Sequence, residues 1–96
     1  MKRRFIILVD DATSDEQNRL TDFLRKRPMV FWHYFSDSWL VVDTDAQWST
    51  ATLRDQLVKL LPGKMVMVLH VDNGTTWAAF GAVKNFDWIQ SDWEPN

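Results

Sequence analysis

The stretch MVFWHYFSDSWLVVDT, residues 29–44, decides how this chain folds. Five aromatic side chains fall within nine residues, and only one histidine and the polar trio Ser36-Asp37-Ser38 interrupt them. Aromatic and β-branched residues favour strands, and a short polar run between two such segments is typical of a turn. The sequence therefore predicts a β-hairpin with strands over residues 30–35 and 39–43, apolar on both of its faces.

The segment before the hairpin predicts a strand followed by a helix. Residues 3–10, RRFIILVD, contain a continuous apolar run, which is typical of a central strand covered on both faces. Thr13 and Glu16 have the spacing of a capping box at a helix N-terminus. The predicted helix runs to about Arg27, where Pro28 stops it.

The segment after the hairpin repeats this order and then extends it. A second helix is expected from residues 49–50 to Pro62-Gly63, followed by a strand over residues 64–71. Asp72-Asn73-Gly74 suits a type I′ turn, because Asn-Gly accepts positive φ angles. This turn predicts a fifth strand over residues 75–80, and a short C-terminal helix follows it.

A weak internal repeat fixes the expected architecture. An offset of 34 residues carries Pro28 onto Pro62 and Phe5 onto Trp39, so each half reads strand, helix, proline, strand. Two interleaved βαβ halves in one antiparallel sheet make a ferredoxin-like α+β sandwich, βαββαβ, with strand order 4-1-3-2. We expect one domain over residues 1–96, with the fifth strand hairpinned beside the fourth.

The bulk composition excludes several classes of protein. A net charge of −2 argues against a general nucleic-acid binder, because such proteins carry a basic excess. The absence of cysteine excludes disulfides, thiolate zinc sites and a cysteine nucleophile. No apolar run approaches the ~20 residues of a membrane span, and the apolar part of residues 1–10 is too short for an export signal. We expect a cytoplasmic protein without membrane contact.

The apolar character of both sheet faces requires an explanation. In the predicted sandwich the two main helices cover one face, and the other face should alternate to polar residues. The strands carry apolar side chains there instead, so something must cover this second face. Either the C-terminal helix with its tryptophans covers it, or a homodimer forms by sheet-to-sheet packing or by a fifth strand that crosses to a partner. The predicted interface residues are Phe31, Trp32, His33, Tyr34, Trp39 and Trp77.

Several segments of the chain resemble a known family. They are Phe31-Trp32-His33-Tyr34, Trp39-Leu40-Val41-Val42, Leu53-Arg54-Asp55-Gln56-Leu57, Trp77-Ala78-Ala79-Phe80-Gly81 and Phe86-Asp87-Trp88-Ile89. Together with the strand that ends in Asp10, they resemble a family of small bacterial and phage proteins with a ferredoxin-like fold. That fold is similar to the CRISPR-adaptation nuclease-like dimers, in whose active members an aspartate at the end of the first strand helps hold a divalent metal. The resemblance implies that Asp10 is the matching position.

Two groups of side chains are candidates for chemistry. Asp10 and Asp11 could hold Mg²⁺ together with their symmetry mates, or they could simply precede and cap the next helix. His33 could act as a general base if Asp37 or Asp43 oriented it, or it could be a packed or interface histidine. The sequence contains no nucleophile elbow, phosphate loop or dinucleotide fingerprint.

These observations favour a non-enzymatic protein-interaction module that forms a homodimer without a cofactor. A phage-borne inhibitor or a subunit of a bacterial defence system would suit a small, acidic, aromatic-rich dimer. The alternative is a metal-dependent nuclease acting on nucleic acid, with Asp10 as a ligand of Mg²⁺.

Overall fold

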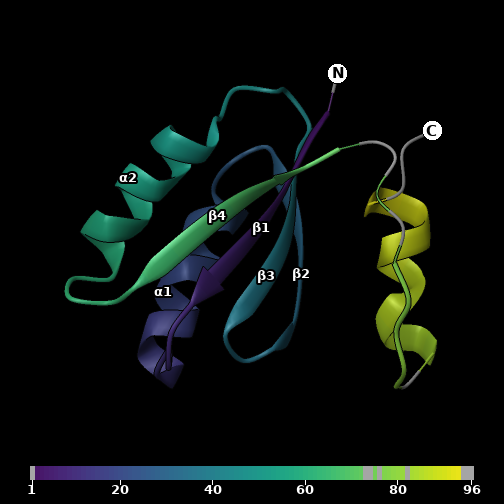
Figure 1. The fold of residues 1–96 in the computed structure, drawn as a ribbon, viewed down its shortest axis with the longest axis horizontal. Coiled ribbons are helices and arrows are strands. Elements are labelled where there is room, and N and C mark those ends of the chain that lie inside the picture. Colours follow the sequence, from purple (N-terminus) through teal and green to yellow (C-terminus); the bar gives the residue numbers. More distant parts are fainter. Residues whose placement is uncertain (1, 73–74, 76, 82, 94–96) are drawn as a thin grey trace.

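The computed structural model describes residues 2–72, 75, 77–81 and 83–93 and has two layers, a four-stranded sheet and a pair of helices (Figure 1). The elements are β1 (Arg3–Val9), α1 (Ser14–Arg25), β2 (Met29–Phe35), β3 (Ser38–Asp43), α2 (Thr50–Leu60) and β4 (Val66–Val71). A 3₁₀ turn, η1 (Val83–Phe86), and a π-helical turn, η2 (Ile89–Trp93), follow near the C-terminus.

The sheet is antiparallel throughout, and its order is β2-β3-β1-β4. Read from the opposite edge this is 4-1-3-2, the order that the sequence predicted. β1 lies in the centre, where Phe5 pairs with Val41 on one side and with His70 on the other. Two strand-helix-strand halves are therefore interleaved in a mixed α+β domain.

The helix boundaries follow local signals in the sequence. The hydroxyl of Thr13 accepts the backbone N–H of Glu16 at 3.2 Å, and Glu16 Oε1 accepts the backbone N–H of Thr13 at 2.9 Å. This predicted capping box starts α1, which ends at Arg25, slightly before the expected Arg27. Ser49 caps α2 in the same way.

Both helices cover the same face of the sheet, and the main core lies between them. Alternate residues of the strands point toward the helices, because side chains alternate across a strand. The fully enclosed side chains include Trp39, which is 0% exposed. The buried members of this core are Phe5, Ile7, Val9, Leu20, Phe23, Leu24, Met29, Trp39, Val41, Leu53, Leu57 and Leu61.

The predicted fifth strand is not observed. Thr75 and residues 77–80, the described part of that stretch, have no strand pairing, and residues 73–74 of the predicted turn lie outside the described residues. The segment of residues 83–93 lies instead beside the sheet (Figure 1), where Ile89 and Trp93 are buried. The chain after β4 therefore follows a path that buries these two large side chains, and the described part of residues 75–80 does not pair with the edge of β4.

The helices of the described residues are all too short or too polar to serve as membrane spans.

Candidate interaction surface

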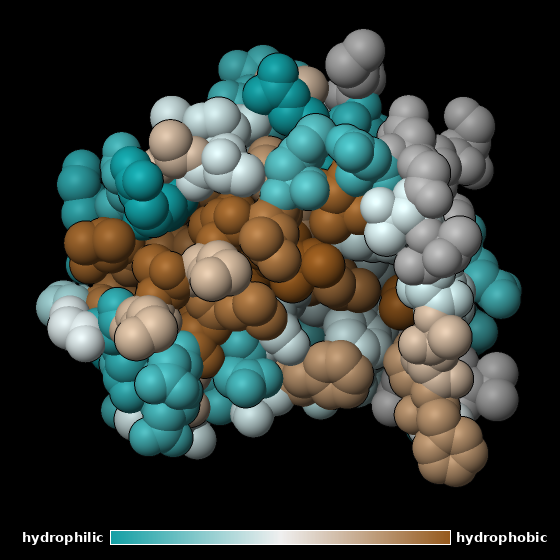
Figure 2. Space-filling model, viewed as in Figure 1, coloured by the Kyte–Doolittle hydropathy of each residue, from teal (hydrophilic) through white to brown (hydrophobic). Residues whose placement is uncertain are grey.

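The sheet face that points away from the helices is largely uncovered, and we call its exposed part the open face. A continuous apolar band crosses this side of the molecule (Figure 2). We define the open face by seven large apolar side chains that are 37–75% exposed: Leu8, Val30, Tyr34, Phe35, Met65, Met67 and Leu69.

Strand register explains why these side chains lie together. Leu8 of β1 pairs with Met67 of β4, and Ile6 pairs with Leu69, so the two strands present apolar neighbours on the same side. Ile6 also pairs with Leu40 of β3 and extends the band across the sheet. Directly opposed residues in an antiparallel pair have Cβ atoms about 4.5–5.5 Å apart, which leaves little room for water between them.

An irregularity in β2 adds aromatic side chains to the open face. Trp32 pairs with Leu40 but Phe35 pairs with Ser38, so β2 contains one extra residue between these two positions. Such a bulge shifts the alternation of side chains. Phe35 therefore lies on the side of Trp32 and Tyr34. The centroid of the Trp32 ring lies 5.1 Å from that of Phe35 and 5.3 Å from that of Tyr34. A strict alternation along residues 30–35 would place Phe35 on the side of His33, and the bulge moves it to the side of Trp32.

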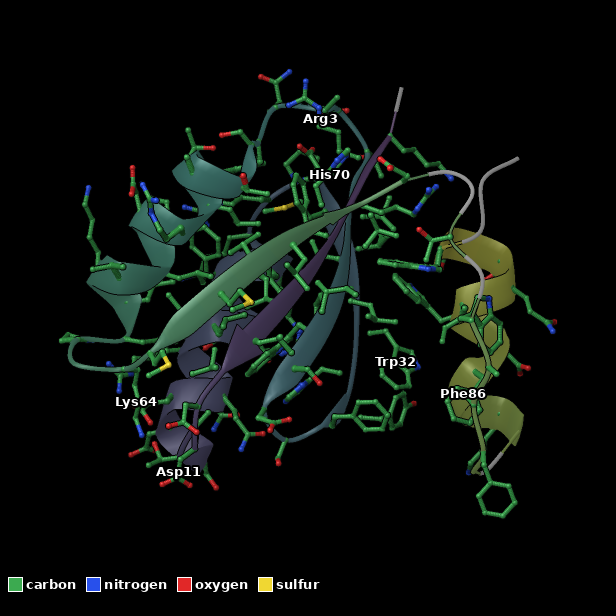
Figure 3. All side chains as sticks on the ribbon, viewed as in Figure 1. Arg3, Asp11, Trp32, Lys64, His70 and Phe86 are labelled. Carbon is green, nitrogen blue, oxygen red and sulfur yellow. The ribbon has the colours of Figure 1, made fainter. Side chains whose placement is uncertain are left out.

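The C-terminal segment covers one end of the same sheet side. Ile89 and Trp93 form a second cluster with Trp32, Val42 and Val71. Trp32 is only 4% exposed there. Its ring stacks on Phe86 at a centroid distance of 5.8 Å, and Figure 3 shows the two residues facing each other. The segment thus shields part of this side and leaves the open face uncovered.

The predicted interface residues are spread over several environments. Tyr34 is 62% exposed on the open face, and Trp77 is 37% exposed in the C-terminal stretch. Phe31 and His33 are half-buried on the helix side, where the guanidinium of Arg25 lies 5.9 Å from the Phe31 ring. Trp32 and Trp39 are buried and have no surface to offer a partner. The predicted interface residues do not include Leu8, Met65, Met67 and Leu69, although the alternation along β1 and β4 places these apolar side chains on one face of the sheet.

His33 is held in a fixed orientation by three contacts. Its Nδ1 lies 2.9 Å from the carbonyl oxygen of Ser38, and its Nε2 lies 3.0 Å from Oε1 of Gln17. The ring stacks on Trp39 with centroids 4.0 Å apart and planes 3° apart. Neither Asp37 nor Asp43 provides the carboxylate that a general base would need. The geometry favours a packed histidine that joins the hairpin to α1.

Asp43 closes the loop between β3 and α2. It is fully buried, and its Oδ2 accepts the backbone N–H of Trp48 at 2.7 Å while Oδ1 accepts that of Asp45 at 3.3 Å. These bonds satisfy the buried carboxylate within the loop. Asp43 therefore has a structural task and is not turned toward the open face.

The acidic end of β1 is tied to the start of α1. Lys64 Nζ donates to the carbonyl oxygen of Asp11 at 2.7 Å and lies 3.3 Å from Oε1 of Glu16 (Figure 3). The pKa of Glu16 is lowered most strongly by the hydrogen bond from the Thr13 backbone N–H. Burial raises this pKa, whereas the Thr13 hydroxyl and Lys64 lower it further. This arrangement matches the interpretation in which acidic residues after the strand belong to the helix start.

The predicted metal ligand Asp10 is exposed at the end of β1. It borders a shallow cavity of about 270 Å³ that Asp37, Leu8, Met65 and Met67 also line. Within the part of the chain that the structure describes, no three histidine or acidic side chains gather as a metal-binding group requires. A role of Asp10 in binding Mg²⁺ stays a prediction.

No protein-family model, no curated protein and no solved structure matches this chain.

Proposed function

We propose that this chain is a ferredoxin-like, non-enzymatic protein-interaction module that works as a homodimer, with the open face of one copy packed against the open face of the other. The observation that carries the proposal is the set of exposed apolar side chains that define the open face. Exposed apolar patches of this kind mark interaction sites in soluble proteins.

The area of the open face supports a partner of protein size. Its seven side chains are about half exposed on average, and a large side chain presents on the order of 200 Å², so together they offer roughly 700 Å². The largest apolar patch of a typical monomer is about 300–600 Å². Each partner in a standard protein interface buries about 800 Å². The open face is therefore close to the area that one side of a stable interface needs.

The chemistry of the open face supports a second copy as that partner. A twofold interface must be complementary to itself, and a surface of aliphatic and aromatic side chains without a central charge meets this condition. Two sheets that pack face to face also lie about 10 Å apart and interdigitate their side chains. Tyr34 and Phe35 would then supply aromatic anchors at one end of the interface.

A pair of lysine substitutions tests the proposal. Met67→Lys places a charge within the open face, and Val58→Lys places the same charge on α2, where Val58 is also 54% exposed. Light scattering over a dilution series should give a dimer for the wild type and Val58→Lys and a monomer for Met67→Lys, with unchanged circular dichroism. A wild type that stays monomeric at high micromolar concentration contradicts the proposal, and so does a dimeric Met67→Lys.

The resemblance to small bacterial and phage proteins extends the proposal to a biological role. A cytoplasmic dimer of this kind would act as a phage-borne inhibitor or as a subunit of a bacterial defence system. This role is supported only by that resemblance, and it depends on the dimer.

A further inference from the structure

The sulfur atoms of this chain are unevenly distributed. It has four methionines and no cysteine. Met29 lies in the main core and is 6% exposed, whereas Met65 and Met67 are 75% and 54% exposed and both belong to the open face. Among the described residues, the accessible thioethers are therefore confined to the proposed dimer surface.

An exposed thioether reacts with peroxide in a defined way. The sulfur lone pair attacks one oxygen of hydrogen peroxide, an S–O bond forms, the O–O bond breaks, and water leaves after proton transfer. The methionine is oxidised to its sulfoxide and the peroxide is reduced to water. The product is polar and chiral, and methionine sulfoxide reductases convert it back.

The surroundings of the two methionines make the sulfoxide hard to bury. Met65 and Met67 line the cavity at the end of β1 together with Leu8, Asp10 and Asp37. A sulfoxide oxygen only accepts hydrogen bonds, and the side chains that line this cavity are either apolar or those of Asp10 and Asp37. A sulfoxide that loses its water against the apolar side chains of a second copy's open face stays unpaired, which is unfavourable.

We infer that Met65 and Met67 form an oxidation site that regulates self-association: peroxide converts them to sulfoxides in the free subunit and thereby prevents the open face from packing against a second copy. This inference rests on the proposed homodimer. Because only the free subunit exposes both sulfur atoms, oxidation removes it from the equilibrium and draws dimers apart by mass action. Assembly in turn protects both side chains.

The experiment treats the purified full chain with hydrogen peroxide, locates the sulfoxides by peptide mass spectrometry and measures the dimer dissociation constant by light scattering. Met65 and Met67 should be oxidised before Met29. Their oxidation should be slower at protein concentrations where the dimer dominates. The dissociation constant should rise at least about tenfold, because four sulfoxides then lie in each interface. A sulfoxide reductase should restore the original value.

Two variants separate the outcomes. The double variant Met65→Leu/Met67→Leu replaces both thioethers with hydrocarbon side chains of similar volume, so peroxide should leave its own dissociation constant, measured first without peroxide, unchanged. The Met29→Leu variant keeps Met65 and Met67, so peroxide should still raise its dissociation constant. If the untreated wild type is monomeric, the proposed dimer itself is wrong. If it is dimeric and its dissociation constant does not change once both sulfoxides have formed, only the oxidation site is overturned.

Discussion

Trp32 connects the C-terminal segment to the sheet, and its truncation should release that segment. The ring is 4% exposed and lies 5.1–5.8 Å from the rings of Phe35, Tyr34 and Phe86. Phe86 belongs to the C-terminal segment, and the other two belong to the hairpin. Trp32→Ala removes the contact to Phe86 and also part of the apolar surface under Ile89 and Trp93.

The magnitude follows from the burial of the ring. Truncation of a buried tryptophan to alanine costs about 3–5 kcal/mol in the free energy of unfolding. Each aromatic pair contributes about 0.5–1.5 kcal/mol beyond the area it buries, and one of the three pairs joins the segment to the sheet. The apolar contact of Trp32 with Ile89 and Trp93 is lost as well, so we expect the free energy of opening of the segment to fall by about 2 kcal/mol. This change corresponds to a roughly 30-fold faster hydrogen exchange of the amides in the segment.

Hydrogen exchange measured by mass spectrometry distinguishes local release from general destabilisation. Trp32→Ala should accelerate exchange most in residues 86–93 and less in β1. Trp39→Ala is the matched control, because Trp39 is fully buried in the main core and its loss costs a similar amount. The control should accelerate exchange throughout the sheet. If Trp32→Ala leaves the protection of residues 86–93 unchanged, the proposed attachment of the segment through Trp32 is refuted.

Two further predictions concern the stability of the fold. The pKa of Glu16 is lowered in the folded state, so its ionised form stabilises the protein above its ordinary pKa of 4.5 and this stabilisation is lost as the pH falls through the lowered folded value. Glu16→Gln should therefore flatten the dependence of Tm on pH below about pH 5, and an unchanged slope in calorimetry contradicts this. Asp43→Ala leaves the backbone N–H groups of Trp48 and Asp45 unpaired and should lower the free energy of urea unfolding by about 2–4 kcal/mol. A loss below about 0.5 kcal/mol, the usual range for surface positions, would mean that water replaces these bonds.

The parts of the fold that could be predicted from the sequence are those with a local cause. Thr13 and Glu16 cap α1 because their spacing fits the first turn, and Pro28 ends the helical region because it cannot continue one. The hairpin forms because Ser36 and Asp37 make a polar turn between two segments of strand-forming residues, and Ser38 of the predicted turn already belongs to β3. The sheet order followed from the strand-helix-strand repeat, whose connections have a preferred hand.

The parts that were missed depend on competition between distant residues. The sequence at Asp72-Asn73-Gly74 favours a turn, yet the next residues can either pair with the edge of β4 or let Ile89 and Trp93 be buried near Val42. A local sequence pattern does not contain the free energy of strand pairing or that of burying the two side chains, so it cannot decide between them. The bulge before Phe35 has the same origin, because its position depends on how β2 and β3 pair and not on β2 alone.

The two explanations that the sequence offered for the apolar second face are compatible, because each applies to a different part of it. The segment of residues 83–93 packs over Trp32, Val42 and Val71, so it shields that end of the sheet and leaves Leu8, Met67 and Leu69 exposed. Two of the aromatic residues that suggested an interface are buried within the chain, Trp39 in the main core and Trp32 under the C-terminal segment. The open face instead depends on aliphatic and thioether side chains together with Tyr34 and Phe35. A substitution that disturbs self-association without unfolding the chain should therefore be sought at Leu8 or Met67 and not at Trp32 or Trp39.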